Sequence, residues 1–507
     1  MRSIPLNLFV LIFSIYILTG SENYRFHSDA SYLRYEVAKS IVERSDVSIP
    51  DGLGVRGKDG RDYSWLAPGS ALLATPFYLI GKLTNVQPQI LVSFENPFFA
   101  AATAALLFLL AQSLGFSSKA SILVSLLYSL GTIAWPASKQ AFDHPLETFC
   151  ILLSAYFLHR YKGNEKTRHI LFAGGAAGMA FLTRPTTVLI LPAAIAFLSI
   201  FYLRKSRSIA NTRHLIRDII LLLIGFFPFA GISFWYNHYR FGSVLETGYS
   251  LIAARTGLDF FTGTSLITGI TGFLFSPGKG FFFYSPVAIL FFFSIRTFVR
   301  KHPEVGAFFI CLTITYLILL SKNIYWHGDW AWGPRYLLAV TPALVLPIAH
   351  LIDSAWWSRK TFRLFTYGLF CISFTIQLVA VSVDPLKYFY YLICEENVIF
   401  SSATGEGVQP IMEPPTEVYF DWEKSPIPAQ FRFASEIAFR SKPFKPTKLP
   451  ENATIAEKLN ASPDLNLYDF WWVYMYFING ISSVFLVVFS LVCLTAHAGI
   501  NLFRARQ

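Results

Sequence analysis

The chain has 507 residues, of which 54% are hydrophobic and only 14% are charged. Soluble domains carry about 25% charged residues, so the composition excludes an ordinary soluble protein. Separate apolar runs of roughly 17–25 residues, the length that crosses a membrane, recur along the chain. The sequence therefore predicts an all-α, polytopic membrane protein.

The net charge of +11 would suit a nucleic-acid ligand, but the chain has no basic arm or aromatic–basic binding module. Basic cytoplasmic loops of a membrane protein explain the charge better. Four of the five cysteines lie within apolar runs and none forms a CxxC pair, so neither a disulfide nor a metal site is indicated. We expect no nucleic-acid partner.

About twelve transmembrane helices fit the apolar pattern. The first run is short and follows Arg2, so a cleaved signal peptide is its alternative interpretation. In the fifth run, Gly174 and Gly178 predict a close helix–helix contact. The predicted spans are 4–19, 90–114, 120–136, 146–162, 170–183, 185–203, 217–236, 281–299, 305–321, 336–352, 361–383 and 471–497.

The segment 66–83, LAPGSALLATPFYLIGKL, is apolar enough to be a further span, but Pro68 and Pro76 interrupt it. Counting it as a span would place every later loop on the opposite side of the membrane. Without it, the inner segments contain 19 Lys and Arg against four acidic residues. That excess agrees with the positive-inside rule, so we interpret 66–83 as an interfacial helix on the outer face.

This threading places both termini in the cytoplasm and divides the chain into three parts. Residues 1–383 form a transmembrane catalytic module with a large first outer loop at 20–89. Residues 384–470 form an extracytoplasmic segment, and residues 471–507 form the last transmembrane helix with a short basic tail. The outer face also receives the segments 137–145, 237–280 and 322–335.

The first outer loop contains DASYLRYEVAKSIVE, in which apolar positions recur at helical spacing. This pattern predicts an amphipathic helix along the membrane that begins at Asp29. A carboxylate at a helix start usually caps the helix. The alternative is a chemical role, because a second acid, Asp143, is predicted on the same side of the membrane.

Asp143 lies in SKQAFDHPLE, a polar gap between two spans. Two acids at a membrane surface suit general-base chemistry or metal coordination. Asp143 could equally cap the helix that begins at His144 and Pro145. We interpret Lys139 and Glu147, in the same stretch, as interfacial.

The stretch NIYWHGDWAWGPRYLLAV, from residue 323, combines an aromatic belt with Arg335 at the start of a span. Arginine at this depth can hold a phosphate with paired donors, or it can simply extend to the lipid headgroups. His327 and Asp329 lie close by, but their spacing fits no standard metal site.

Two further outer stretches, YRFGSVLETGYSL and FLFSPGKGFFFYSP, contribute the candidate substrate contacts Arg240, Glu246 and Lys279. The Gly-Lys turn suits an anion but lacks the P-loop spacing, which argues against a nucleotide site. Arg184, before Pro185, is either an interface anchor or another phosphate contact.

Taken in order, these stretches resemble the GT-C superfamily of membrane glycosyltransferases. The chain is most similar to bacterial relatives of protein O-mannosyltransferases and of the lipid A aminoarabinose transferase, over about residues 5–350. The segment 384–470 is much less recognisable. The resemblance rests on DASYLRYEVAKSIVERSDVSIP, YSWLAPGSALLATPFYLIG, FDHPLE, FGSVLETGY, SPGKGFFFYSP and WAWGPRYLL.

The resemblance implies transfer of a sugar from a polyprenyl phosphate donor, with inversion at the anomeric carbon. Asp29 matches the first-loop acid expected to activate the acceptor. Asp143 matches a second acid that organises the site or a bound cation, with His144 beside it as a substrate contact. Arg335 and Lys279 would hold the donor phosphate and stabilise the leaving group.

One motif departs from the aminoarabinose transferases. They carry Lys-Pro-Pro where this chain has Leu66, Ala67 and Pro68, and that lysine contacts the donor phosphate in those relatives. Arg61 and Lys279 are the candidate replacements in this chain. The phosphate contacts are therefore the least transferable part of the resemblance.

The implied acceptor is a glycan, a lipid or a protein, and the implied home is a bacterial inner membrane with the site facing the periplasm. A divalent cation at Asp29 and Asp143 is left open as a cofactor. The alternative function is a transporter or flippase of lipid-linked sugars. Transporters usually bury their binding groups in mid-membrane, whereas these acids gather at one surface.

Overall fold

A computed structural model describes residues 3–21, 29–140, 142–205, 209–256, 260, 263–405, 408–441, 444 and 452–506. The side chains of residues 29–31, 210, 255–256, 401–405, 408–413, 464 and 505–506 lie outside this description. Asp29 is therefore placed by its backbone alone.

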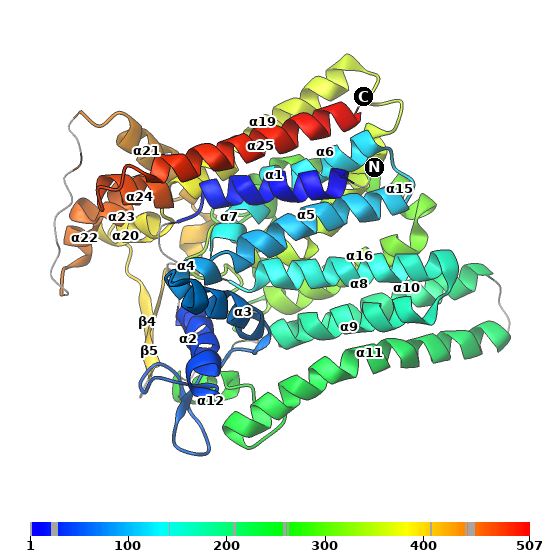
Figure 1. The fold of residues 1–507 in the computed structure, drawn as a ribbon, viewed down its shortest axis with the longest axis horizontal. Coiled ribbons are helices and arrows are strands. Elements are labelled where there is room, and N and C mark those ends of the chain that lie inside the picture. Colours follow the sequence, from blue (N-terminus) through cyan, green and yellow to red (C-terminus); the bar gives the residue numbers. More distant parts are fainter. Residues whose placement is uncertain are drawn as a thin grey trace.

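Long helices lie side by side in a bundle (Figure 1). The start of α1 and the end of α25 lie near each other at one end of it (Figure 1). The helices of the bundle are α1 (Ile4–Leu18), α5 (Glu95–Ser113), α6 (Ser118–Gly131), α8 (His144–Asn164), α9 (Thr167–Thr183), α10 (Ile190–Lys205), α11 (Ile209–Phe241), α15 (Phe291–Lys301), α16 (Pro303–Ser321), α19 (Lys360–Ser382) and α25 (Val484–Arg506).

Among the described residues, seven helices are long and apolar enough to cross a membrane. The predicted class, a helical integral membrane protein, is confirmed, but the predicted number of about twelve spans is not. Every predicted span does coincide with helix, although α1 and α6 are short. The seven helices occupy 88–113, 185–205, 211–241, 303–321, 335–352, 360–382 and 484–504.

Prolines divide two of the predicted spans into short helical pieces. Pro286 follows a break at Ser285, and Pro342 and Pro347 interrupt the run that begins at Arg335, because proline removes an intrahelical hydrogen bond. The pieces are α14 (Phe281–Tyr284), η2 (Pro286–Leu290), η3 (Arg335–Val340), α17 (Thr341–Val345), η4 (Leu346–Ile348) and α18 (Ala349–Ile352).

The first outer loop gathers at the end of the bundle away from the two termini (Figure 1). The helix α2 (Asp29–Arg44) begins where the sequence predicts it, lies across the direction of the bundle helices, and buries Leu33, Val37 and Ala38. It is followed by β1 (Ser48–Ile49), β2 (Val55–Arg56), β3 (Asp62–Tyr63), α3 (Gly69–Thr84) and α4 (Pro88–Val92).

The predicted interfacial segment 66–83 forms α3, whose 16 residues span only about 24 Å. One face buries Ala71, Ala74 and Tyr78 against the protein. Leu79, Ile80 and Leu83 remain exposed at the other side. An apolar exposed face on a helix too short to cross a bilayer of about 30 Å agrees with an interfacial position.

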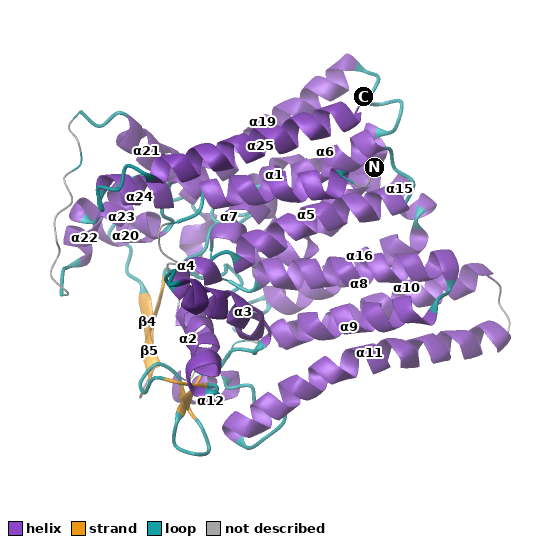
Figure 2. Ribbon diagram, in the orientation of Figure 1, coloured by secondary structure: helices purple, strands orange, loops and turns teal. Residues whose placement is uncertain are grey.

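The segment 384–470 lies at the same end as the first loop (Figure 1). Two small antiparallel sheets are both found there: β1-β3-β2, and β4 paired with β5 (Figure 2). The elements of the segment are α20 (Leu386–Cys394), β4 (Ser401–Gly405), β5 (Val408–Glu413), η5 (Thr416–Phe420), α21 (Pro426–Ala438), α22 (Ile455–Ala461) and α23 (Pro463–Asn466).

The predicted last span, 471–497, is not one helix. The structure divides it into α24 (Trp471–Phe477) and α25. Gly480 lies between them with a φ of +69°, a conformation that glycine adopts at little cost. The membrane helix therefore begins at Val484 rather than at Trp471.

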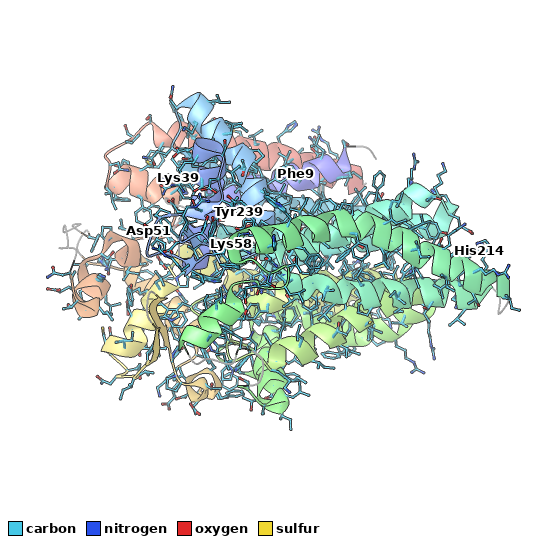
Figure 3. All side chains as sticks on the ribbon, turned by 90° about the horizontal axis from the view of Figure 1, so that it is seen from below. Phe9, Lys39, Asp51, Lys58, His214 and Tyr239 are labelled. Atoms are coloured by element: carbon cyan, nitrogen blue, oxygen red, sulfur yellow. The ribbon has the colours of Figure 1, made fainter. Side chains whose placement is uncertain are left out.

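The two ends of the bundle differ in character (Figure 3). Lys39, Asp51 and Lys58 of the first loop lie at one end with Tyr239, which is near the end of α11. His214, near the start of α11 and within the predicted basic inner segment 204–218, lies at the other end. This separation is the one expected from the positive-inside rule.

Candidate functional site

Asp143 directly precedes α8, yet its side chain makes no capping hydrogen bond. Its two carboxylate oxygens instead pair with two arginines, Oδ2 with Arg34 at 3.1 Å and Oδ1 with Arg184 at 2.9 Å. Asp143 is 5% exposed. The capping interpretation is therefore wrong, and Asp143 holds two cations in place.

Three separate elements build this charge cluster. Arg34 comes from α2, and Arg184 follows α9 immediately before Pro185. Asn96, near the start of α5, donates its side-chain amide to the carbonyls of Gln140 at 2.5 Å and Phe142 at 2.7 Å. These bonds fix the chain that leads into Asp143.

Glu147 is 1% exposed, so the interpretation of this residue as interfacial is wrong. Its Oε1 accepts a hydrogen bond from the Tyr316 hydroxyl at 2.9 Å. Its Oε2 lies 2.9 Å from Nδ1 of His144 and 3.5 Å from Nε of Arg184. Glu147 therefore extends the ion pairs of Asp143 into the core, one helical turn along α8.

Lys139 is also buried rather than interfacial, with a side chain 7% exposed. Its ammonium group pairs with the carboxylate of Asp469 at 2.8 Å and donates to the carbonyl of Val381 at 2.6 Å. Ser21 donates to the same carboxylate at 2.5 Å. Lys139 thus ties the short helix α7 (Ala134–Lys139) to the end of the 384–470 segment.

Arg335 lies buried at the start of η3, beside the Asp143 cluster. Its Nη2 pairs with Asp329 at 2.5 Å and donates to the Tyr336 hydroxyl at 3.3 Å. Its guanidinium lies 3.7 Å from the centre of the Phe142 ring. Among the described residues, no group accepts a hydrogen bond from its Nε or Nη1. Two nitrogens of this buried guanidinium therefore have no acceptor among the described residues, which is unusual for a buried polar group.

The ring of Tyr336 connects the two parts of the site. The guanidinium carbons of Arg184 and Arg335 lie 5.4 and 5.0 Å from its centre. The imidazole of His144 packs edge-on against the same ring at 5.4 Å. Asp143 and His144 are therefore brought together with Arg335, which comes from a separate stretch of sequence.

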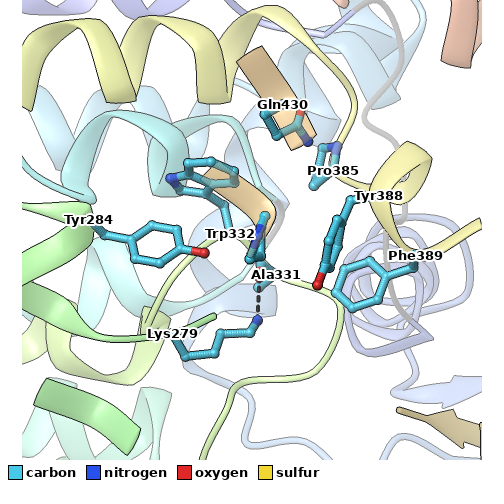
Figure 4. Close-up of a pocket in the computed structure, with 9 residues that line it drawn as sticks. Lys279, Tyr284, Ala331, Trp332, Pro385, Tyr388, Phe389 and Gln430 are labelled. Atoms are coloured by element: carbon cyan, nitrogen blue, oxygen red, sulfur yellow. Dashed lines mark hydrogen bonds between the residues drawn. The ribbon is translucent and has the colours of Figure 1, made fainter. Parts of the chain in front are cut away.

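Lys279 reaches the same region from the Gly-Lys turn. Its ammonium group donates to the carbonyls of Asp329 at 3.0 Å and Ala331 at 2.6 Å, and the second of these bonds is drawn in Figure 4. Arg335 pairs with the side chain of Asp329, so one short loop anchors both cations. The side chain of Lys279 is 1% exposed.

Burial and the neighbouring charges decide the protonation states. Burial alone would raise the pKa of Asp143, but Arg34 and Arg184 hold that pKa well below its ordinary value. Burial, together with Arg184, lowers the pKa of His144 to about 4. Burial also lowers the pKa of His327, beside Lys279 and Arg335. At neutral pH the site therefore contains an ionised Asp143 and neutral histidines.

The other predicted contacts lie elsewhere and have protein partners. Arg240 is buried, donates to Ser64 and, at 2.8 Å, to the side chain of Asn237. Arg61 pairs with Asp46 at 2.5 Å and Asp59 at 2.7 Å. Glu246 accepts from the backbone of Gly248 at 2.8 Å. Their geometry favours roles in holding the outer loops together.

The described residues do not suit a divalent cation at Asp143. Both carboxylate oxygens already pair with arginines, and oxygen ligands of divalent cations must be free to coordinate. No group of three or more His, Cys, Asp or Glu residues within the described part of the chain could hold a metal ion. The side chain of Asp29, the other predicted ligand, lies outside the description.

Sequence reasoning did not assign Arg34 or Tyr316 to the site, and it left Arg184 as an alternative. For Arg34 a signal was present. It precedes the buried Val37 and Ala38 by three and four positions, which puts a cation on the apolar face of a helix. Tyr316, inside a span, carried no such signal.

Part of the chain matches a known protein family in sequence. Residues 73–232 match the family model described as dolichyl-phosphate-mannose-protein mannosyltransferase. The matched residues include Asp143, His144, Glu147 and Arg184, but neither Arg34 nor Arg335. This match confirms, for that segment, the predicted resemblance to the GT-C membrane glycosyltransferases. No curated protein matches the sequence.

Two solved structures of low sequence identity align with much of the chain, both at TM-scores below 0.5. The apo oligosaccharyltransferase of Archaeoglobus fulgidus is 11% identical, with a TM-score of 0.46 over 78% of this chain and 58% of that one. ArnT from Cupriavidus metallidurans, bound to undecaprenyl phosphate, is 10% identical, with a TM-score of 0.49 over 90% of this chain and 84% of that one. The chain thus spans less than two thirds of the length of the oligosaccharyltransferase.

Proposed function

We propose that the chain is an inverting glycosyltransferase that uses a polyprenyl-phosphate-linked sugar. The observation that carries this proposal is Arg335, a buried cation with two unused donors beside the Asp143 cluster. Planar paired donors match the oxygens of a phosphate. The matched family segment supports the class of reaction.

In the proposed reaction, an acceptor hydroxyl oxygen attacks the anomeric carbon as the bond from that carbon to the phosphate oxygen breaks. The bonding electrons leave with polyprenyl phosphate, and the hydroxyl proton passes to a base. Negative charge grows on the phosphate in this step. In this proposal Arg335 and Lys279, which the loop at 329–331 holds, stabilise that charge.

Asp29 is the proposed base, on the strength of the resemblance and of its place at the start of α2. Asp143 is a poor base, because two arginines keep it ionised and occupy both oxygens. We assign it a positioning role instead: it holds Arg34 on α2 and Arg184 beside Tyr336. His144 and Glu147 would support the same cations.

The acceptor in this proposal is a glycan, a glycolipid or a protein, and the home is a bacterial inner membrane. The site then faces the periplasm, because it lies at the end of the bundle with the first loop and 384–470 (Figure 1). Basic loops occupy the other end. Hexosyl and pentosyl donors both remain candidates.

A direct test compares Arg335→Gln and Arg335→Lys with wild type. We expect transfer from a polyprenyl-phosphate sugar to fall about 10²–10³-fold in Arg335→Gln, and by less in Arg335→Lys, which keeps the charge but not the paired donors. Lys82→Gln is the matched control, because Lys82 is an exposed residue of α3. Initial rates with detergent-purified protein measure the effect. Wild-type rates in Arg335→Gln would remove the phosphate assignment.

A cellular test identifies the sugar and the acceptor together. Mass spectrometry would compare glycolipids and surface glycans of wild type, a deletion strain and the deletion complemented with Asp29→Asn. Loss of the same sugar in both altered strains is the expected result. An unchanged profile in the Asp29→Asn strain would exclude Asp29 as the base.

The alternative function, a flippase of lipid-linked sugars, also requires phosphate-binding cations. The position of Arg335 and Asp143 at one end of the bundle favours chemistry at a surface over passage through the membrane. Reconstituted vesicles separate the two functions. Lipid-linked sugar that changes leaflet without any sugar transfer would establish the flippase.

A further inference from the structure

A small cavity lies where the segment 384–470 meets the membrane module (Figure 4). The volume left within it is about 10 Å³, enough for one water-sized group. The module lines it with Lys279, Tyr284, Ala331 and Trp332, and the 384–470 segment lines it with Pro385, Tyr388, Phe389, Pro426 and Gln430.

Gln430, on α21, is fully buried. Neither its amide oxygen nor its amide nitrogen has a hydrogen-bond partner among the described residues. The same holds for the indole nitrogen of Trp332, which is 5% exposed. In contrast, the hydroxyl of Tyr284 donates to Gly278 at 2.6 Å and that of Tyr388 donates to Lys424 at 2.5 Å. The unused polar groups of this lining are thus an amide and an indole.

Buried polar groups are almost always paired, so those left unpaired require an explanation such as a ligand. The amide of Gln430 can both accept and donate, and Trp332 can only donate. The natural partner of the amide is a neutral group that also donates and accepts. A hydroxyl has that character, and it is small enough for the cavity.

The walls of the cavity indicate the class of molecule that brings this hydroxyl. Tyr284 and Trp332 meet edge to face at 4.9 Å, and Tyr388 and Phe389 form the opposite side (Figure 4). A few placed polar groups among aromatic side chains are typical of small-molecule sites. The cavity also adjoins Lys279, one of the two proposed phosphate contacts.

We infer that this cavity is a specificity subsite for one hydroxyl of a carbohydrate, bound by the amide of Gln430. The inference rests on the proposed function, because a glycosyltransferase is what would bring a sugar to this place. It also assigns a role to the 384–470 segment, because α21 supplies Gln430, the residue that would distinguish one sugar from another. A pocket that hydrogen-bonds a substrate hydroxyl discriminates strongly against an analogue that lacks it.

The test measures binding of free sugars and does not depend on transfer. Methyl glycosides of glucose, galactose and mannose, and their 6-deoxy forms, would be added to the purified full-length protein and followed by saturation-transfer NMR. Gln430→Met removes the amide and keeps the volume. Gln112→Met is the matched control, since Gln112 already donates to Phe116 and Ser121, both at 2.9 Å.

At least one glycoside should bind to wild type and to Gln112→Met, and Gln430→Met should bind it about tenfold more weakly or not at all. In thermal unfolding the order of the two variants should be reversed: Gln112→Met, not Gln430→Met, should be the impaired one. Gln112→Met should lower Tm, whereas Gln430→Met should leave Tm unchanged or raise it, because an unpaired amide contributes nothing to the folded state.

Two results would overturn the inference: no glycoside binding to wild type, and equal binding by Gln430→Met. In both cases the cavity holds only a resident water. Glycoside binding that requires Gln430, in a protein that transfers no sugar, would keep the subsite and reject the glycosyltransferase. Sugar transfer that is unchanged in Gln430→Met would keep the glycosyltransferase and reject the subsite.

Discussion

Asp143 and His144 are neighbours in sequence whose side chains make different contacts. Asp143 uses both oxygens to pair with arginines. His144 contacts Glu147 through Nδ1, while no described residue bonds its Nε2. The first residue therefore contributes to the fold as well as to the site. The second has a nitrogen still available to a ligand.

Replacing Asp143 by Asn should remove one counter-charge from each of Arg34 and Arg184. We expect the free energy of unfolding to fall by about 3–5 kcal/mol, the usual cost of breaking a buried pair, and transfer activity to fall with it. Asp51→Asn is the control, because that carboxylate is 82% exposed in its pair with Arg56 and should cost at most about 1 kcal/mol. Urea unfolding in detergent measures both. Equal stability of the two variants would contradict the buried-pair argument.

His144 should make the protein sensitive to mild acid. An unfolded histidine takes up its proton near pH 6.5, whereas burial lowers the pKa of His144 in the fold to about 4. Between these values the unfolded state binds more protons, so stability falls as the pH falls. The loss attributable to His144 is about 3 kcal/mol. In His144→Gln the unfolding midpoint should depend less on pH between pH 6.5 and 4. An unchanged pH dependence would show that His144 is not the source of the acid sensitivity.

At the scale of elements, α9 and α11 pack closely because glycines line their contact. A Cβ added at Gly174 would lie 2.0 Å from the carbonyl oxygen of Leu222, and one at Gly178 would lie 2.6 Å from that of Phe226. The predicted close contact at these glycines is confirmed. Small residues allow this approach in a membrane, where no hydrophobic force drives helices together.

Gly174→Ala and Gly175→Ala form a matched pair on α9. The first puts its Cβ into the backbone of α11 and should lower the free energy of unfolding by about 1–3 kcal/mol. The second meets a ring carbon of Phe229 at 3.6 Å and the carbonyl oxygen of Gly225 at 3.9 Å, both ordinary contacts, so its better helix propensity should leave stability equal or slightly higher. Thermal unfolding of the two purified variants gives the comparison. A loss of similar size in both would show that the contact is not tightly packed.

At the scale of the whole molecule, the charged site, the first loop and the 384–470 segment share one end of the bundle (Figure 1). His214, in the predicted basic inner segment 204–218, lies at the other end (Figure 3). This arrangement places the proposed chemistry at one membrane surface. It also provides a way to test the orientation.

Single cysteines should react from opposite sides of the membrane. Ser435, on α21, and Lys166, between α8 and α9, are both exposed. In a background with all five native cysteines replaced by serine, a membrane-impermeant maleimide should label Ser435→Cys in intact cells or spheroplasts and Lys166→Cys only after permeabilisation. Gel-shift or mass analysis measures the labelling. The reverse pattern would invert the topology and place the site in the cytoplasm.

The sequence by itself determined the class of the molecule and the places of its helices. Apolar runs and basic loops are local properties, because every backbone polar group in a bilayer must be satisfied within its own helix. The start of α2 at Asp29 and the short helix α3 followed from periodicity and from proline. The division of 471–497 into two helices could not be predicted in this way, because apolar residues continue on both sides of Gly480.

Only the tertiary structure decided which polar residues meet. Arg34, Asp143 and Arg184 come from separate elements, and hydrogen bonding and burial join them. Asp143 looked like a helix cap because caps are local, yet it pairs with more distant arginines that neutralise a buried charge more effectively. Gln430 and Trp332 likewise line one cavity only because α21 packs against the membrane module. Local sequence patterns thus decide which segments lie in the membrane, whereas long-range packing of the outer segments brings the residues of the site together.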